Sequence, residues 1–233
     1  MISSLLLAYR ESLEAVLIVG IILMTLTRQN KQSLKKYVII GAGLGVLISL
    51  LGGGALFLSA QGLEEETMEL IEGVMMLLAS GLIAYFVVWM ANQNKGISAS
   101  ISQSVSTLST GFSLALLAFL GVFREGLELV IFTLANLSAQ TVDIASGTVI
   151  GILLAIVSGL IIFKSTFKLN LNWIFNALAL VLIFIGAELI EEGLIKLIPS
   201  TSVYEDLVFY GYNIVALVIF FRQDLKKLIV KAS

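Results

Sequence analysis

The chain contains no cysteine and no histidine, and only one proline among its 233 residues. Without cysteine it can form neither disulfides nor thiolate metal sites. Without histidine it lacks imidazole metal ligands, a Ser-His catalytic pair and a histidine pH sensor. A metal ion bound by this chain must therefore be held by oxygen atoms, which suit hard cations.

Charge is also scarce. Only 13% of the residues are charged, against roughly 25% in an average soluble domain. Hydrophobic residues make up 58% of the chain and the mean hydropathy is +1.03. We therefore expect an all-α integral membrane protein, with the lipid bilayer as its surroundings and no nucleic-acid partner.

Seven apolar stretches approach the roughly 20 residues that a membrane-spanning helix needs. They cover 2–27, 37–60, 68–91, 111–137, 143–163, 172–198 and 203–221. The first stretch does not resemble a cleavable signal peptide, because it carries Arg10, Glu11 and Glu14 where such a peptide is purely apolar. The pattern predicts a multi-pass protein of the cytoplasmic membrane.

Basic residues are distributed unevenly between alternate loops. One side is predicted to carry eleven of them, namely Arg28, Lys31, Lys35, Lys36, Lys95, Lys164, Lys168, Arg222, Lys226, Lys227 and Lys231. The other side has only Lys196. The positive-inside rule then places the N-terminus outside and the C-terminus in the cytoplasm.

Acidic residues gather on the predicted outer side. They lie around the second loop and near the end of the sixth stretch, at Glu64, Glu65, Glu66, Glu69, Glu72, Glu188, Glu191 and Glu192. One interpretation is an ordinary solvated surface, which we expect for Glu64–Glu66. The other is a vestibule that concentrates cations, to which Glu72, Glu188 and Glu191 are the stronger candidates because they lie deeper in apolar sequence.

The chain repeats itself in two ways. Two charged pentapeptides, 10–14 and 124–128, lie in the first and fourth stretches, and a stripe of small residues recurs in the second and fifth. The stripes are Gly41, Gly45, Ser49 and Gly53, and Gly147, Gly151, Ala155 and Gly159. Small residues at this spacing allow transmembrane helices to approach closely. Since a three-helix unit reverses direction when repeated, the pattern indicates an inverted-repeat transporter.

This repeat divides the single membrane domain into four parts. Residues 1–91 form the first three-helix repeat and 111–198 the second, although their third helices do not align convincingly. Residues 92–110 are a serine-rich cytoplasmic connector, interpreted as a short amphipathic helix. Residues 199–233 form the seventh helix and a basic cytoplasmic tail.

The pentapeptides Arg-Glu-Ser-Leu-Glu and Arg-Glu-Gly-Leu-Glu place three charges in the middle of each apolar stretch. Each such charge costs roughly 2.5–3.5 kcal/mol on insertion scales. On a helix the three side chains share one arc, and the arginine lies four residues from the second glutamate, close enough to pair with it. Two interpretations remain. One is a pair of structural Arg–Glu salt bridges, Arg10 with Glu14 and Arg124 with Glu128, which leaves Glu11 and Glu125 as surplus buried charges. The other is a cation site between the helices, with Glu11, Glu14, Glu125 and Glu128 as ligands and the two arginines in support.

These motifs in a seven-helix chain resemble the oxidase-dependent iron permeases, which include fungal high-affinity permeases and bacterial EfeU-type permeases. The second pentapeptide matches the family motif fully, and the first departs from it only in having Ser12 for glycine. The resemblance implies that the four motif glutamates translocate ferric iron as a transported substrate, with no organic cofactor. It also implies a separate oxidase or periplasmic iron-handling proteins as partners, and leaves a homo-oligomer open.

We therefore expect an inward iron permease rather than an enzyme. One alternative is a transporter or exchanger of another cation, such as lead or manganese. A membrane di-metal carboxylate enzyme is a weaker alternative, because such sites normally include histidine.

Overall fold

The computed structural model describes residues 2–92, 104–105, 108, 110–136, 141–164 and 171–222. Within them the fold is helical and contains no strand. Seven long helices carry it: α1 (Ile2–Arg28), α2 (Lys35–Gln61), α3 (Glu65–Asn92), α5 (Gly111–Leu134), α6 (Thr141–Lys164), α7 (Leu171–Leu197) and α8 (Glu205–Phe220). The predicted stretches agree with these bounds to within three residues at every end. The short 3₁₀ helices η1 (Gln32–Leu34) and η2 (Pro199–Tyr204) precede α2 and α8.

Three of the described helices are long and apolar enough by composition to cross a membrane, within 32–61, 65–88 and 142–164. The charged pentapeptides raise the polarity of α1 and α5, and α8 has only 16 residues. Large apolar side chains are widely exposed, among them Leu50, Leu58 and Leu207, each at least 66% exposed. Such a surface suits contact with hydrocarbon. The predicted orientation stays a prediction.

Local sequence explains where individual helices end. Asn30 adopts a left-handed conformation with φ 56°. The Lys31 amide donates to the Leu26 carbonyl and the Asn30 amide to that of Thr27. This is the Schellman pattern, with asparagine in the position that glycine usually takes. At the other end of the chain, α7 stops two residues before Pro199, which lacks the amide hydrogen needed to continue it.

The described helices form two compact units. Unit 1 contains α1, α2, α6 and nearly all of α5, and unit 2 contains α3, α7 and α8. Each unit therefore takes helices from both expected repeats. The predicted division into repeats stays a prediction, and the predicted connector 92–110 and basic tail lie mostly outside the described residues.

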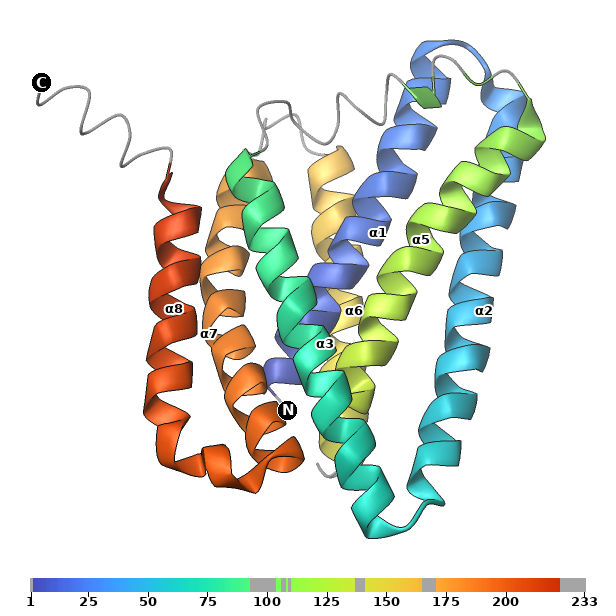
Figure 1. The fold of residues 1–233 in the computed structure, drawn as a ribbon. Coiled ribbons are helices and arrows are strands. Elements are labelled where there is room, and N and C mark those ends of the chain that lie inside the picture. Colours follow the sequence, from blue (N-terminus) through green and yellow to red (C-terminus); the bar gives the residue numbers. More distant parts are fainter. Residues whose placement is uncertain are drawn as a thin grey trace, which may run out of the picture. The chain divides into compact units, whose positions relative to one another are not determined.

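In unit 1, α1 and α5 run antiparallel (Figure 1), as the motif pairing across them also requires. One end of the unit is closed by a hydrophobic cluster. It consists of Ile22, Leu26, Val38, Val105, Leu114 and Ala118, all fully buried.

The two small-residue stripes join helices of opposite predicted repeats. Gly45 of α2 packs on the α5 backbone, where an added Cβ would lie 3.0 Å from the Phe119 carbonyl oxygen. Gly151 of α6 packs on the α1 backbone in the same way, with an added Cβ 2.5 Å from the Leu5 carbonyl oxygen. Because lipid tails are as apolar as leucine, such backbone contact contributes much of the association between membrane helices.

In unit 2, α7 packs against both α3 and α8. Gly193 of α7 faces α3, where an added Cβ would lie 3.0 Å from the Met76 Cβ. The Ser80 hydroxyl of α3 donates to the Gly186 carbonyl oxygen of α7 at 2.8 Å. The sequence had shown no clear match between these two helices, yet close small-residue contacts pair them as well.

Candidate metal site

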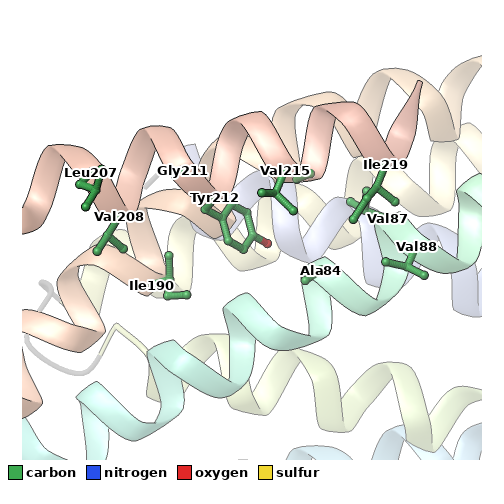
Figure 2. Close-up of a pocket in the computed structure, with 11 residues that line it drawn as sticks. Ala84, Val87, Val88, Ile190, Leu207, Val208, Gly211, Tyr212, Val215 and Ile219 are labelled. Atoms are coloured by element: carbon green, nitrogen blue, oxygen red, sulfur yellow. The ribbon is translucent and has the colours of Figure 1, made fainter. Parts of the chain in front are cut away.

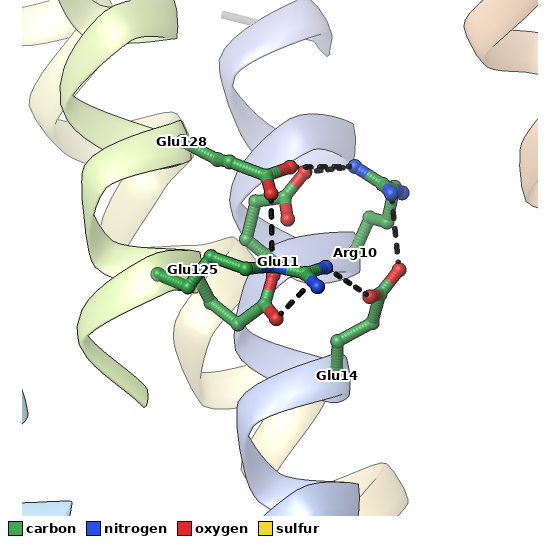
Figure 3. A network of polar contacts seen from close by, with 6 residues as sticks. Arg10, Glu11, Glu14, Glu125 and Glu128 are labelled. Atoms are coloured by element: carbon green, nitrogen blue, oxygen red, sulfur yellow. Dashed lines mark hydrogen bonds and ion pairs between the residues drawn. The ribbon is translucent and has the colours of Figure 1, made fainter. Parts of the chain in front are cut away.

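The two charged pentapeptides meet inside unit 1. Arg10, Glu11 and Glu14 come from α1, and Arg124, Glu125 and Glu128 from α5. Figure 3 shows the side chains of the two helices converging on one another. The predicted arc on each helix therefore faces its partner. Four of the six side chains are buried: Arg10, Glu11, Glu14 and Glu125.

Four of these residues form a closed ring of alternating charge. The Arg10 Nη2 lies 3.1 Å from the Glu14 Oε1, and the Glu14 Oε2 lies 3.8 Å from the Arg124 Nη2. The Arg124 Nε lies 3.2 Å from the Glu128 Oε1, and the Glu128 Oε2 lies 3.7 Å from the Arg10 Nη1. Two contacts follow the predicted spacing within a helix, and two cross between α1 and α5.

The remaining two glutamates attach to the ring. Arg10 forms an ion pair with Glu11, and the Arg124 Nη2 lies 3.2 Å from the Glu125 Oε1. Each arginine therefore also reaches the glutamate next to it in the sequence, Glu11 or Glu125. The charge excess remains, since four carboxylates face two guanidinium groups.

Three carboxylates come close enough to share one ion. Oxygens of Glu11, Glu125 and Glu128 all lie within 4.8 Å of one another. Hard cations bind oxygen at about 2.0–2.6 Å, so their ligands can be up to about 5 Å apart. The Glu11 Oε2 and the Glu125 Oε2 are buried without a hydrogen-bond partner among the described residues. Buried carboxylate oxygens in that state are costly unless a cation or proton satisfies them.

Glu14 has a different position from the other three. It does not belong to the converging group, and instead bridges Arg10 and Arg124. The sequence predicted four equivalent ligands. The structure separates three carboxylates that face one point from one that holds both arginines.

The sequence paired the stripes with the motifs as parts of one repeat, but did not predict that a stripe residue contacts a motif residue. The structure places Ser49 against Gly126, where an added Cβ would meet the Ser49 side chain. In α6, Gly151 packs near Leu5 and Gly159 packs on Val16, which places the buried Ala155 at the level of Ser12. The aligned sequences contain this signal. In one pairing the stripe carries the serine, Ser49, and the motif carries the smaller residue, Gly126. In the other pairing the motif carries the serine, Ser12, and the stripe carries the smaller residue, Ala155.

The predicted outer glutamates all belong to unit 2. Glu64, Glu65, Glu66, Glu69, Glu188 and Glu192 are exposed, and Glu191 is partly exposed. Glu72 is only 2% exposed, and its Oε2 accepts a hydrogen bond from the Lys196 Nζ at 2.8 Å. Sequence reasoning missed this pairing. Glu72 is thus neutralised by the only basic residue on its predicted side.

The fold is that of a helical membrane protein, with opposing Arg-Glu motifs inside one of its two units. The chain belongs to the iron permease FTR1 family, whose family model matches residues 1–205.

Two named relatives agree with this assignment. The chain is 30% identical to the ferrous iron permease EfeU of Yersinia pestis, over 88% of this chain and 75% of the relative. It is 31% identical to the protein of the same name in Escherichia coli O6:H1, over 77% and 67%. An uncharacterised protein of Archaeoglobus fulgidus is 26% identical over 83% and 69%. No solved structure matches the chain.

Proposed function

We propose that this protein carries iron across the cytoplasmic membrane into the cell, through a site formed by Glu11, Glu125 and Glu128. The observation that carries the proposal is the convergence of these three carboxylates within 4.8 Å, inside a buried network with an excess of negative charge. Family membership supports iron transport as such. The ligand assignment is our own.

Charge balance favours ferrous iron. Four carboxylates and two guanidinium groups carry a formal charge of −2, which one divalent ion neutralises. A trivalent ion would leave a positive charge in a buried site, which is costly. The ferric preference expected from the sequence has no support in the relatives, whose names specify ferrous iron. An all-oxygen site does not by itself distinguish iron from manganese. Manganese is therefore included as a competitor in the iron-uptake assay.

The arginines can balance the carboxylates that do not hold an ion. Arg10 and Arg124 between them contact all four glutamates. When the ion binds the three converging glutamates, the guanidinium groups of Arg10 and Arg124 turn toward Glu14, which both arginines already contact. An arginine stays charged throughout, so the exchange requires no proton from it.

Delivery and release follow from the expected inverted repeat. We propose that the exposed acidic residues of unit 2 raise the local cation concentration by their field. Relative movement of the two repeats then opens the site to either side in turn. A periplasmic iron-handling protein would supply the ferrous ion at the outer face; an oxidase, whose product is ferric iron, would not.

Substitution of single glutamates tests this function. Glu11→Gln and Glu125→Gln each retain the shape of the side chain but remove one anionic ligand. We expect uptake of radioactive iron into cells to fall at least about a hundredfold, and competition by manganese to disappear with it. Asp143→Asn, at an exposed acidic residue of unit 1 that the proposal does not use, is the matched control and should transport normally.

Two further measurements make the result decisive. Protein abundance in the membrane fraction separates lost transport from lost folding, and uptake is compared for ascorbate-reduced and ferric citrate iron. Normal uptake by a well-expressed Glu11→Gln variant would refute the site. Faster uptake of ferric than of ferrous iron would refute the charge-balance argument alone.

A further inference from the structure

An apolar groove runs along unit 2 between α3 and α8, with α7 also contributing to its lining. It has a volume of about 460 Å³, and its walls include Ala84, Val87 and Val88 of α3, Ile190 of α7, and Val215 and Ile219 of α8. Figure 2 shows these side chains along the facing helices. The groove belongs to neither the metal site nor unit 1.

The lining offers nothing to a polar ligand. Its polar side chain is that of Tyr212, whose hydroxyl donates to the Ser80 carbonyl oxygen at 3.1 Å and is therefore already satisfied. A ligand of this groove must be an apolar chain. In a protein that spans a bilayer, the acyl chains of lipids are such ligands.

The dimensions fit one acyl chain. The groove follows α8 from Leu207 to Ile219, which at 1.5 Å per residue is about 18 Å. One leaflet of a bilayer contributes a hydrocarbon depth of about 15 Å. At Gly211, within the groove, no atom lies within 4 Å of the position that a Cβ would take.

The two ends of α8 differ in charge, and this difference selects the lipid headgroup. The helix begins with Glu205 and Asp206. Just beyond its last residue lies Arg222, which is exposed, and the sequence continues with Lys226, Lys227 and Lys231. Such a cluster beside a membrane helix attracts anionic lipids. A phosphate headgroup would be repelled at the first end and attracted at the second.

We propose that unit 2 binds one anionic phospholipid, with an acyl chain lying in the α3–α8 groove and the phosphate headgroup at Arg222, just beyond the end of α8. The lipid fills a space that the protein's own side chains leave open, and so joins α8 to α3. The unit then depends on an anionic membrane for its full stability.

Native mass spectrometry of the full chain in detergent can test this, with dioleoyl phosphatidylglycerol and dioleoyl phosphatidylcholine as the probes. For the first lipid molecule that binds, we expect phosphatidylglycerol to bind at least about tenfold more tightly than phosphatidylcholine. Gly211→Leu places a side chain in the groove without a clash, and should weaken binding of both lipids about tenfold. Gly81→Leu is the matched control, because it also has no neighbour within 4 Å but does not line the groove; it should bind like the unchanged chain.

The headgroup contact has its own variant. Arg222→Gln should reduce the preference for phosphatidylglycerol about fivefold, as for one basic residue near an anionic surface, and leave phosphatidylcholine binding unchanged. A phosphatidylglycerol with a photoreactive acyl chain should label peptides of α3 and α8 in the unchanged chain but not in Gly211→Leu. Equal binding of the two lipids, or unaltered binding and labelling in Gly211→Leu, would overturn the proposal.

Discussion

At the scale of the residue, the two motif arginines are chemically equal but lie in different surroundings. The side chain of Arg10 is 2% exposed and that of Arg124 is 62% exposed. Arg10 contacts Glu11, Glu14 and Glu128, so its removal would leave three carboxylates without their buried cation. Arg124 makes the corresponding contacts with Glu14, Glu125 and Glu128, but more than half of its side chain is not covered by protein.

This difference predicts unequal effects on stability. Arg10→Met should cost about 3–5 kcal/mol, the usual result of removing one partner of a buried charge pair. Arg124→Met should cost less than Arg10→Met, because less of its side chain is packed against protein. Thermal unfolding of the two variants in one detergent measures the difference. Equal losses of melting temperature would contradict it.

At the scale of the element, the stripes determine which helices meet. Each stripe brings a helix of one predicted repeat against a motif helix of the other: α2 against α5, and α6 against α1. The contact between Gly126 and Ser49 lies beside the site, because the neighbouring Glu125 is one of the converging ligands. The position of Ser49 therefore controls how close α5 and its carboxylates can lie to α2.

A compensating pair of substitutions tests this contact. Gly126→Ala should destabilise the chain by about 1–3 kcal/mol, because its methyl group would overlap the Ser49 side chain. Adding Ser49→Gly should restore most of the melting temperature and of iron uptake.

Gly54→Ala serves as the control, since no atom lies within 4 Å of its added Cβ. Additive effects of Gly126→Ala and Ser49→Gly, without rescue, would show that the two residues do not act on one another.

At the scale of the whole molecule, the two compact units do not coincide with the two repeats predicted from the sequence. The opposing motif helices share one unit, and the acidic residues proposed to attract cations belong to the other. In the proposed function, ion coordination and ion attraction therefore belong to different units.

The predicted orientation can be tested directly because the chain has no cysteine of its own. A single cysteine in place of Glu66 should react with a membrane-impermeant maleimide in intact cells. A cysteine in place of Lys31 should react only after permeabilisation. Both residues are accessible to a reagent, Glu66 being exposed and Lys31 partly exposed. The reverse pattern would place the N-terminus in the cytoplasm.

The sequence by itself determined the helices and the chemistry. Apolar runs of bilayer length, with almost no proline, leave little choice but helices, and the absence of histidine and cysteine restricts a metal ion to oxygen ligands. The spacing of the motifs also determined that Arg10 can reach Glu14, because such pairs depend only on helix geometry.

Only the tertiary structure decided how the two motifs combine. The closed ring, the separate position of Glu14 and the partnership of Glu72 with Lys196 all depend on contacts between residues more than a hundred positions apart. Helical periodicity shows which face of a helix a side chain occupies but not which helix lies opposite that face. That choice follows from close packing of small residues, such as Ser49 on Gly126, and it becomes visible only when the helices are assembled.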